Sequence, residues 1–196
     1  MPDGRTVSGI EAIAAARAIG FPVAVKAVST SLPHKTEAGA VALQLESEPA
    51  VAEAVASMNA RLAGLALEFL VEEMVADGVA EILVGIKRDP IFGPVLVLAS
   101  GGVFVELFAD SRTVILPAED RAIQKALELL KAWRLVEGYR GRPAGDADAA
   151  ISAIQAVVRF AERNEDRLLE LDVNPLIVRP LGLGVAAADA LIRWVE

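Results

Sequence analysis

The chain combines short apolar runs with longer amphipathic segments. Runs rich in β-branched residues favour an extended backbone and predict strands, at 21–29, 40–47, 66–75, 80–89, 94–100, 103–110, 167–178 and 184–188. Segments with an apolar period near 3.6 residues predict helices, at 8–20, 48–64, 118–135 and 146–164. The interleaving of the two patterns indicates a mixed helix and strand protein.

Turn and cap residues mark several boundaries of these elements. Ser8 followed by Glu11 has the spacing of a capping box, and Gly20 is placed to end that helix. Gly101-Gly102 separates two strand-like runs, which predicts a hairpin there. We therefore expect an α+β fold with mainly antiparallel sheets, divided near "MVADGV" into an N-terminal lobe over 1–75 and a C-terminal lobe over 76–196.

One predicted strand has a polar face. In "LELDVNP", alternation places Glu170, Asp172 and Asn174 on one side and Leu169, Leu171 and Val173 on the apolar side. If Leu181-Gly182 forms a two-residue turn, Pro180 faces Leu183, and counting outwards brings Asn174 opposite Asp189. Two such oxygen donors could share a cation. A polar solvent-facing strand remains the alternative, because a turn one residue longer reverses the faces.

Composition narrows the chemistry. The 196 residues carry a net charge of −8 and no cysteine, so disulfides and thiolate sites are excluded. One histidine excludes an all-histidine zinc site, and the remaining oxygen ligands favour magnesium, calcium or manganese. The sequence contains no run of basic residues, so we do not expect nucleic acid as a partner. No apolar run is long enough to span a membrane or to form a signal sequence, so we expect a soluble cytoplasmic protein.

Two groups of charged residues allow either a binding or a surface role. Lys26 lies inside the apolar run "PVAVKA", where a lysine either extends its ammonium to solvent or meets an anion. Glu72, Glu73 and Glu81 flank a glycine-containing turn, where they could bind ribose hydroxyls or remain solvated.

The only histidine, His34, lies in the turn-like segment "STSLPHKTEAGAV" beside Lys35. Most loop histidines have no chemical role. A neutral imidazole is nevertheless a good phosphoryl acceptor near neutral pH, and Lys35 could offset phosphate charge.

Taken in order, several motifs resemble the ATP-grasp domain of NDP-forming acyl-CoA synthetases, that is, ADP-forming acetate–CoA ligase and the related β subunit of succinyl-CoA synthetase. The motifs cover nearly the whole chain: "GFPVAVKA", "HKTEAGAV", "LVEEMVADGVAEILVGIKRDPIFGPVLVLASGG", "VELFAD", "GYRG", "ELDVNPL" and "AADALI". Each motif is weak alone, but their order and spacing are specific.

The resemblance implies an ATP-grasp fold in which two α+β lobes hold ATP or ADP. It implies that Lys26 contacts phosphates, that the backbone of Glu72, Glu73 and Met74 meets adenine, and that Glu81 holds ribose. Asn174 and Asp189 match its Mg²⁺ ligands, with Asp172 close by, and His34, aided by Lys35, matches a phosphoryl carrier.

The implied reaction is acyl-CoA + ADP + phosphate ⇌ acid + CoA + ATP. This chain would exchange phosphoryl between nucleotide and a phosphohistidine on an α-type CoA-binding partner, within a larger oligomer. A different class also stays open, in which the domain is a regulatory module, without ligase activity, of a protein lysine acetyltransferase.

The sequence departs from the family pattern at three places. Ala40 and Ser100 stand where glycines are usual, which bears on loop flexibility and catalytic rate. The abrupt start before "GRTVSG" suggests a domain cut from a longer polypeptide.

Overall fold

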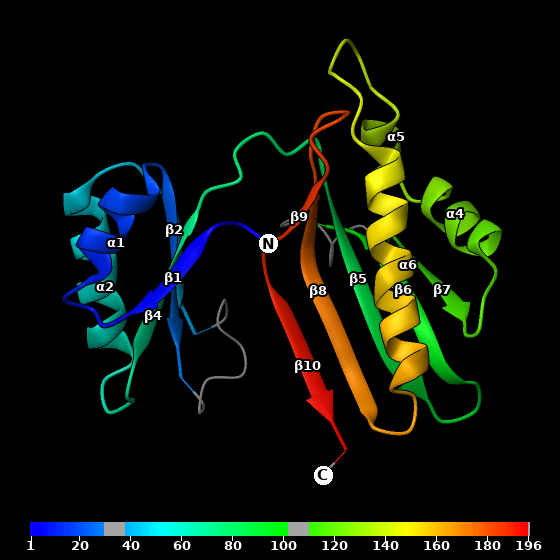
Figure 1. The fold of residues 1–196 in the computed structure, drawn as a ribbon, viewed down its shortest axis with the longest axis horizontal. Helices are drawn as coiled ribbons and strands as arrows, with labels where there is room; N and C mark the ends of the chain where they lie inside the picture. The colour runs from blue at the N-terminus through cyan, green and yellow to red at the C-terminus, as the bar shows by residue number, and fades with distance from the viewer. Residues whose placement is uncertain (30–37, 102–109, 196) are drawn as a thin grey trace. The chain divides into compact units, whose positions relative to one another are not determined.

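A computed structural model describes residues 1–29, 38–101 and 110–195. The chain divides into two compact units, Pro2–Ala76 and Asp77–Glu196, with Met1 grouped with the second. Every strand pairing described within either unit is antiparallel, and helices accompany both sheets (Figure 1). The predicted α+β class with antiparallel sheets is therefore confirmed.

The first unit is a four-stranded sheet with two helices on one face (Figure 1). The strand order is β1-β4-β2-β3. Its elements are β1 (Gly4–Val7), α1 (Ala12–Ile19), β2 (Val23–Val28), β3 (Val41–Leu45), α2 (Glu48–Arg61) and β4 (Glu68–Glu73).

One face of this sheet makes the core of the first unit. Val25 and Phe69 from the strands are buried with Ala16 and Val55 from the two helices. Because side chains alternate along a strand, Lys26 and Glu72 lie on the face away from the helices. The helices thus leave the opposite face for polar groups.

The ends of α1 follow the sequence signals in part. Glu11 Oε2 accepts hydrogen bonds from Ser8 N (3.1 Å) and Ser8 Oγ (2.6 Å). The Ser8–Glu11 contact forms, but the prediction that Ser8 caps the helix is wrong. The helix begins at Ala12 with Glu11 as its N-cap residue, no side chain caps it, and the serine hydroxyl donates to the glutamate. Gly20 ends the helix with φ of 99°, as predicted.

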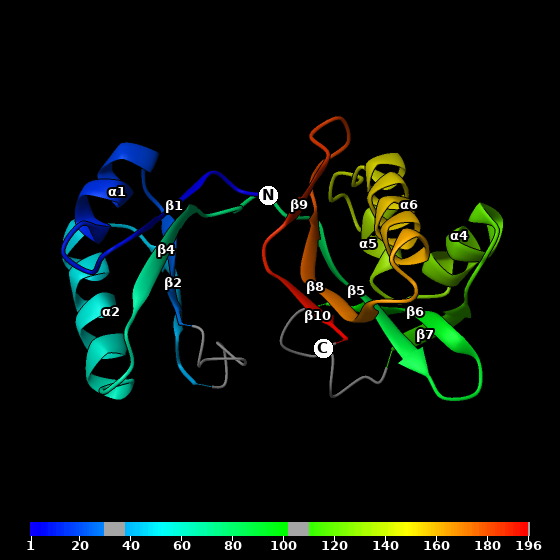
Figure 2. The ribbon, with the colours of Figure 1, turned by 60° about the horizontal axis from the view of Figure 1, so that its bottom comes forward.

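The second unit contains a larger sheet with strand order β10-β8-β5-β6-β7, in which β9 also pairs with β8. Figure 2 shows helix α6 on one side of this sheet. The elements are β5 (Ala80–Asp89), β6 (Gly93–Ser100), β7 (Ser111–Ile115), α4 (Asp120–Glu128), α5 (Trp133–Val136), α6 (Ala147–Arg163), β8 (Leu168–Val178), β9 (Val185–Ala187) and β10 (Ala190–Trp194).

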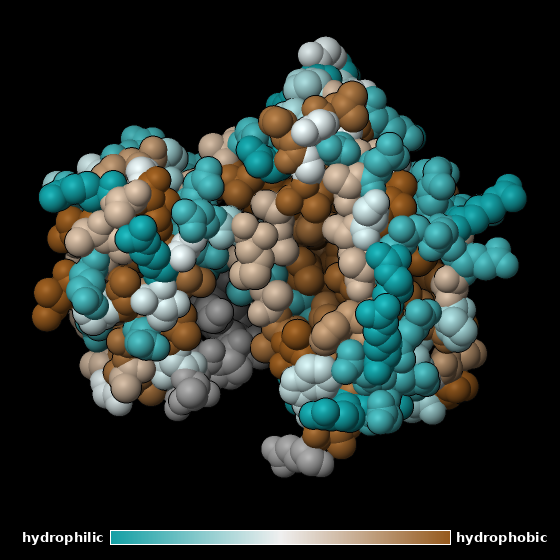
Figure 3. Space-filling model, viewed as in Figure 1, coloured by the Kyte–Doolittle hydropathy of each residue, from teal (hydrophilic) through white to brown (hydrophobic). Residues whose placement is uncertain are grey.

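The core of the second unit lies between its sheet and its helices. α6 contributes Ile154 and Val158, which are buried together with Ile82 and Leu98 of the strands. The outer side of α6 is polar, and hydrophilic side chains follow this helix in Figure 3. No helix among the described residues has the length and low charge content needed to span a bilayer.

The single helix predicted over 118–135 is wrong, because the segment forms α4 and α5 separated by a short break. Asp110 Oδ2 accepts from Lys131 N at 2.7 Å, and Ser100 Oγ accepts from Ala132 N at 3.1 Å. These two tertiary acceptors take amides at the break, so the sequence period alone could not show it. The predicted strand and hairpin at 101–110 lie mostly outside the described residues.

Strands β1, β7 and β10 have no counterpart in the sequence prediction. Each lies at the edge of its sheet among the described strands, is four or five residues long, and has no buried residue. The placement of Leu169 on the buried face is also wrong, because Leu168 is buried instead. A register shift in the β8–β10 ladder accompanies this change of face. Arg193 pairs with Glu170 and Trp194 pairs with Leu168, so the extra residue in β8 is Leu169.

Candidate functional site

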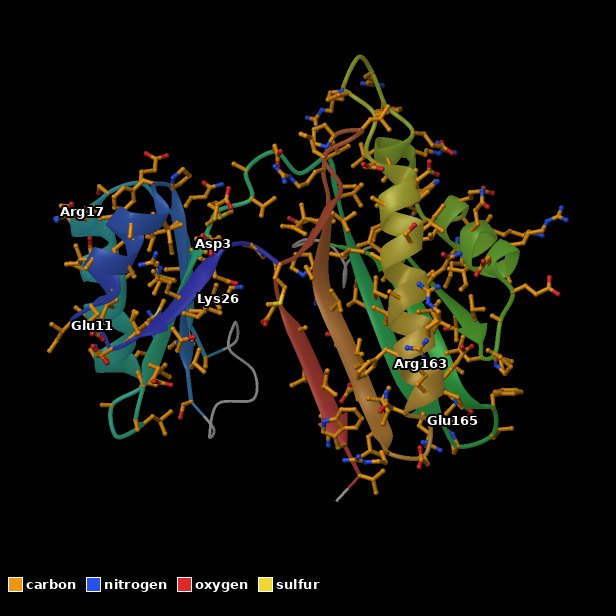
Figure 4. The ribbon with its side chains drawn as sticks, in the orientation of Figure 1. Asp3, Glu11, Arg17, Lys26, Arg163 and Glu165 are labelled. Atoms are coloured by element: carbon orange, nitrogen blue, oxygen red, sulfur yellow. The ribbon has the colours of Figure 1, made fainter. Side chains whose placement is uncertain are left out.

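The first unit contains a buried ion pair on its helix-free sheet face. Lys26 Nζ lies 2.5 Å from Glu72 Oε2, and their side chains are only 8% and 3% exposed. Neighbouring strands β2 and β4 bring the two residues together. In Figure 4, Lys26 lies on the side of the sheet away from α1 and α2. The lysine is therefore held in place and does not extend freely into solvent.

A glycine makes room for this pair. Gly4 of β1 is the cross-strand neighbour of Glu72. A Cβ at Gly4 would lie 2.8 Å from Glu72 Cγ, closer than side chains pack. The absence of a side chain at position 4 thus allows the glutamate to reach the lysine.

The segment predicted to meet adenine uses its amides within the protein. Glu73 N donates to Asp3 O at 2.8 Å, and Met74 N donates to Pro22 O at 3.2 Å. An adenine contact at this segment would therefore depend on carbonyl oxygens or on rearrangement of these bonds. The roles of Glu72, Glu73 and Met74 towards adenine stay predictions.

Glu81 lies at the start of β5, in the second unit, and is exposed. Its carbonyl accepts a hydrogen bond from Gly101 N at 2.6 Å. A Cβ at Gly101 would lie only 2.6 Å from the Glu81 backbone, so only glycine fits there. Glu81 thus belongs to a different unit from Lys26 and Glu72.

The hairpin predicted from the C-terminal sequence is confirmed. Leu183 N donates to Pro180 O at 2.9 Å, which closes a turn with Leu181-Gly182 at its centre. β8 and β9 pair in the register expected from that turn, with Leu176 opposite Ala187. The same register continues to Asn174, whose N–H donates to Asp189 O at 3.1 Å.

This register brings together the backbones of residues with oxygen-bearing side chains. Asn174 lies opposite Asp189, because its N–H donates to the Asp189 carbonyl. Asp172 follows two positions away in β8, and the glycine opposite it in β5 is Gly85. A Cβ on Gly85 would lie 3.6 Å from Asp172 Oδ1, so the carboxylate lies over this glycine.

The charges around Asp172 are negative. Burial, and then the carboxylates of Glu170 and Asp189, raise the pKa of Asp172. Glu170 is also paired with Arg193 across the β8–β10 ladder at 3.0 Å. Carboxylate and amide oxygens are ligand types that suit a hard divalent cation, and a cation near Asp172 and Asp189 would relieve this repulsion.

The acidic side chains near Asp172 do not by themselves form a complete set of metal ligands. Within residues 1–29, 38–101 and 110–195, no group of three His, Cys, Asp or Glu side chains is arranged to hold a metal. The predicted set instead requires the amide oxygen of Asn174. Magnesium commonly keeps several water ligands, so two or three protein oxygens suffice for it.

His34 and Lys35, the predicted phosphoryl carrier and its neighbour, lie outside the described residues. The side-chain pairing of Glu72 with Lys26 was not predicted from the sequence. Alternation places Lys26 on the other strand face from Val25, and Glu72 on the other face from Val71. Only the pairing of β2 with β4 shows that Lys26 and Glu72 meet.

Comparisons with known proteins place the chain in a family. The family model described as ATP-grasp domain matches residues 2–194. The chain is 38% identical over 185 residues to trans-feruloyl-CoA synthase FCS1 of an unknown prokaryotic organism, covering 92% of this chain and 26% of that protein. It is 30% identical over 187 residues to the β subunit of ADP-forming acetate–CoA ligase II of Pyrococcus furiosus. This match covers 93% of this chain and 79% of that subunit.

The fold agrees with that of a solved relative. The dinucleotide-forming acetyl-coenzyme A synthetase 1 of Ca. Korarchaeum cryptofilum, in complex with coenzyme A, Ca-AMPCP and HgCl⁺, is 33% identical with a TM-score of 0.86. The match covers all of this chain and 86% of that one. A second structure of that protein, with coenzyme A and Mg-AMPPCP, gives a TM-score of 0.79 at 33% identity, covering 100% and 85%.

Several of the curated relatives are much longer proteins. They are about four times as long as the matched region, which spans 25–26% of each. Two findings show the family: the ATP-grasp model matches nearly every residue of the chain, and the chain covers most of the β subunit from Pyrococcus furiosus. The chain therefore belongs to the ATP-grasp family, in the branch found in ADP-forming acetate–CoA ligases.

Proposed function

We propose that this chain is the nucleotide-binding component of an ADP-forming acyl-CoA synthetase. It would bind ATP or ADP with Mg²⁺ and exchange phosphoryl with a phosphohistidine on a CoA-binding partner. The observation that carries the proposal is the β8–β9 register, which sets Asn174 opposite Asp189 with Asp172 nearby. Relatives named as ADP-forming ligases support it, since one of them is a separate β subunit.

The residues have distinct tasks in this proposal. Lys26, oriented by Glu72, would hold phosphate oxygens, and Glu81 would bind the ribose hydroxyls. Asn174, Asp189 and Asp172 would hold Mg²⁺, which when bound neutralises charge on the phosphates. Phosphoryl transfer depends mainly on such positioning and charge neutralisation.

His34 would carry the phosphoryl group. An imidazole nitrogen of His34 forms a bond to the γ-phosphorus while the bond from that phosphorus to the β–γ bridging oxygen breaks, and ADP leaves. The phosphoramidate then passes its phosphoryl group to the histidine of the partner, which restores neutral His34. The reverse sequence makes ATP from ADP.

Binding is tested by calorimetry with ADP, with and without Mg²⁺. We expect Asp189→Ala to weaken Mg-ADP about tenfold, or about 1.4 kcal/mol, and to change ADP affinity in EDTA little. Glu162→Ala, which removes an exposed carboxylate of α6, is the matched control and should change neither. Equal loss of both affinities in Asp189→Ala would contradict the metal role.

The relay is tested with γ-labelled ATP and the CoA-binding partner. Wild-type protein should pass acid-labile label to the partner, and His34→Ala should pass none while still binding Mg-ADP. Acyl-CoA synthesis that survives in His34→Ala would remove His34 from the mechanism. Binding of Mg-ADP without any transfer by the wild type would favour a binding module over an enzyme component.

A further inference from the structure

Asp146 joins the start of a helix to the turn of the β8–β9 hairpin. Its Oδ1 accepts from Ala149 N at 3.2 Å, in the first turn of α6. Its Oδ2 accepts from Gly182 N and Gly184 N, both at 3.0 Å. The carboxylate therefore does more than cap a helix, because two of its three hydrogen bonds go to a distant turn.

The backbone around Asp146 holds the same turn. Asp146 N donates to Arg179 O at 2.9 Å, and Leu181 N donates to Ala144 O at 3.0 Å. Gly182 and Gly184 have φ of 83° and 75°, which glycine adopts without strain. The turn is thus attached to the segment before α6 through both of its sides.

The position of this turn decides the register of the hairpin. A slip of one residue would place Asp189 opposite a neighbour of Asn174 instead of opposite Asn174 itself. A slipped turn would also present different amides to Asp146, so its two bonds to Gly182 and Gly184 favour the observed register. Asn174 is about 20 Å along the strand from the turn, too far for Asp146 to touch a cation there.

We propose that Asp146 is a positioning residue for the Asn174–Asp189 pair, acting by fixing the β8–β9 turn. This inference rests on the proposed metal role of that pair. It predicts that loss of the turn bonds weakens metal-dependent nucleotide binding, although Asp146 contacts neither nucleotide nor metal.

A second hairpin provides a matched control. Asp89 Oδ1 accepts from Ile91 N (2.8 Å) and Phe92 N (3.0 Å) at the β5–β6 turn. As at Asp146, backbone N–H donors lower the pKa of this carboxyl, first Phe92 at Asp89 and first Ala149 at Asp146. The β5–β6 turn is fixed in a similar way, but its hairpin carries none of the proposed metal ligands.

The test compares Asp146→Ser with Asp89→Ser in the full chain. Serine can still cap α6 but is too short to bond both glycine amides. We expect Asp146→Ser to reduce affinity for Mg-ADP about tenfold, the low end for groups that orient metal ligands. Its ADP affinity in EDTA should stay within about twofold, and Asp89→Ser should lower Tm yet leave the ratio of the two affinities unchanged.

Three outcomes would count against the inference. The deciding quantity is the ratio of the affinity for Mg-ADP to the affinity for ADP in EDTA. If this ratio changes in Asp189→Ala but not in Asp146→Ser, only this inference is overturned. Unchanged ratios in both would overturn the metal role and this inference with it. A ratio that also falls in Asp89→Ser would show a general effect of loosened hairpins and remove the specific role of Asp146. If Asp146→Ser does not fold, Asp146→Asn, which keeps the side-chain size, replaces it.

Discussion

Each of the two sheets sets a glycine opposite a carboxylate, but the two carboxylates have contrasting surroundings. In the first unit Gly4 faces Glu72, which is almost fully buried and lies 2.5 Å from the Lys26 ammonium. In the second unit Gly85 faces Asp172, which is half-buried and whose charge neighbours are acidic. On the first sheet the negative charge of Glu72 is paired with the positive charge of Lys26. On the second sheet Asp172 lies near other negative charges.

This difference separates two ways of preparing a charged site. A buried pair such as Lys26–Glu72 keeps its geometry only while both members are present, because either charge alone is costly to bury. A set of repelling oxygens such as Asp172 and Asp189 is instead relieved by a cation that arrives with the ligand. The lysine and the glutamate of the first face are already paired with each other, whereas the second face is expected to gain most when nucleotide and metal bind.

Lys26→Met should have the largest effect on stability. It leaves the Glu72 carboxylate buried without its ammonium, so we expect a loss of about 3–5 kcal/mol in the free energy of unfolding. Urea denaturation of the full chain measures this. The control is Lys87→Met, because Lys87 is an exposed lysine opposite Glu170 in the other sheet, and such pairs contribute below about 1 kcal/mol. Similar losses in both variants would contradict the comparison.

The two glycines should respond differently to alanine. At Gly4 a Cβ would lie 2.8 Å from Glu72 Cγ, so we expect Gly4→Ala to destabilise by about 1–3 kcal/mol. At Gly85 the nearest atom is 3.6 Å away, an ordinary contact. Gly85→Ala should therefore stabilise by about 0.5 kcal/mol through the unfolded chain. Thermal unfolding of both variants tests the difference in sign.

Asp172→Asn should raise stability in the absence of metal, by less than about 1 kcal/mol because the carboxylate is half-buried. The substitution removes repulsion from Glu170 and Asp189 while keeping the side-chain shape. The same variant should gain less Tm than wild type on addition of Mg-ADP. A loss of stability in EDTA would show that this carboxylate is already balanced within the protein.

Asp77→Asn should have the smallest effect on stability. Its effect comes from loss of an attractive ion pair, whereas that of Asp172→Asn comes from loss of repulsion between carboxylates. Hydrogen bonds from Arg179, and the charge of that residue, hold the pKa of Asp77 below its ordinary value of 3.8. The ion pair therefore contributes stability above pH 3.8, which is lost as pH falls through the lower folded pKa. Unfolding midpoints of wild type and variant should converge in that acidic window, and a constant difference would contradict the pairing.

The sequence allowed prediction of elements whose signals are local. Leu181-Gly182 is a two-residue turn, so counting outwards from it correctly paired Asn174 with Asp189. The break between α4 and α5 depends on Asp110 and Ser100, which are distant in sequence, and no local pattern shows it. The tie between Asp146 and Gly182 is likewise tertiary, since its aspartate has the ordinary appearance of a helix cap.

Each sheet is built from the strands of its own unit. The described strands of the first sheet lie between Gly4 and Glu73, and those of the second lie between Ala80 and Trp194. Each unit has its own hydrophobic core. During synthesis the first unit can therefore complete its sheet before the second has left the ribosome, because its strand pairings need no later residue. An interrupted chain ending after Ala76 would already hold the buried lysine and its glutamate.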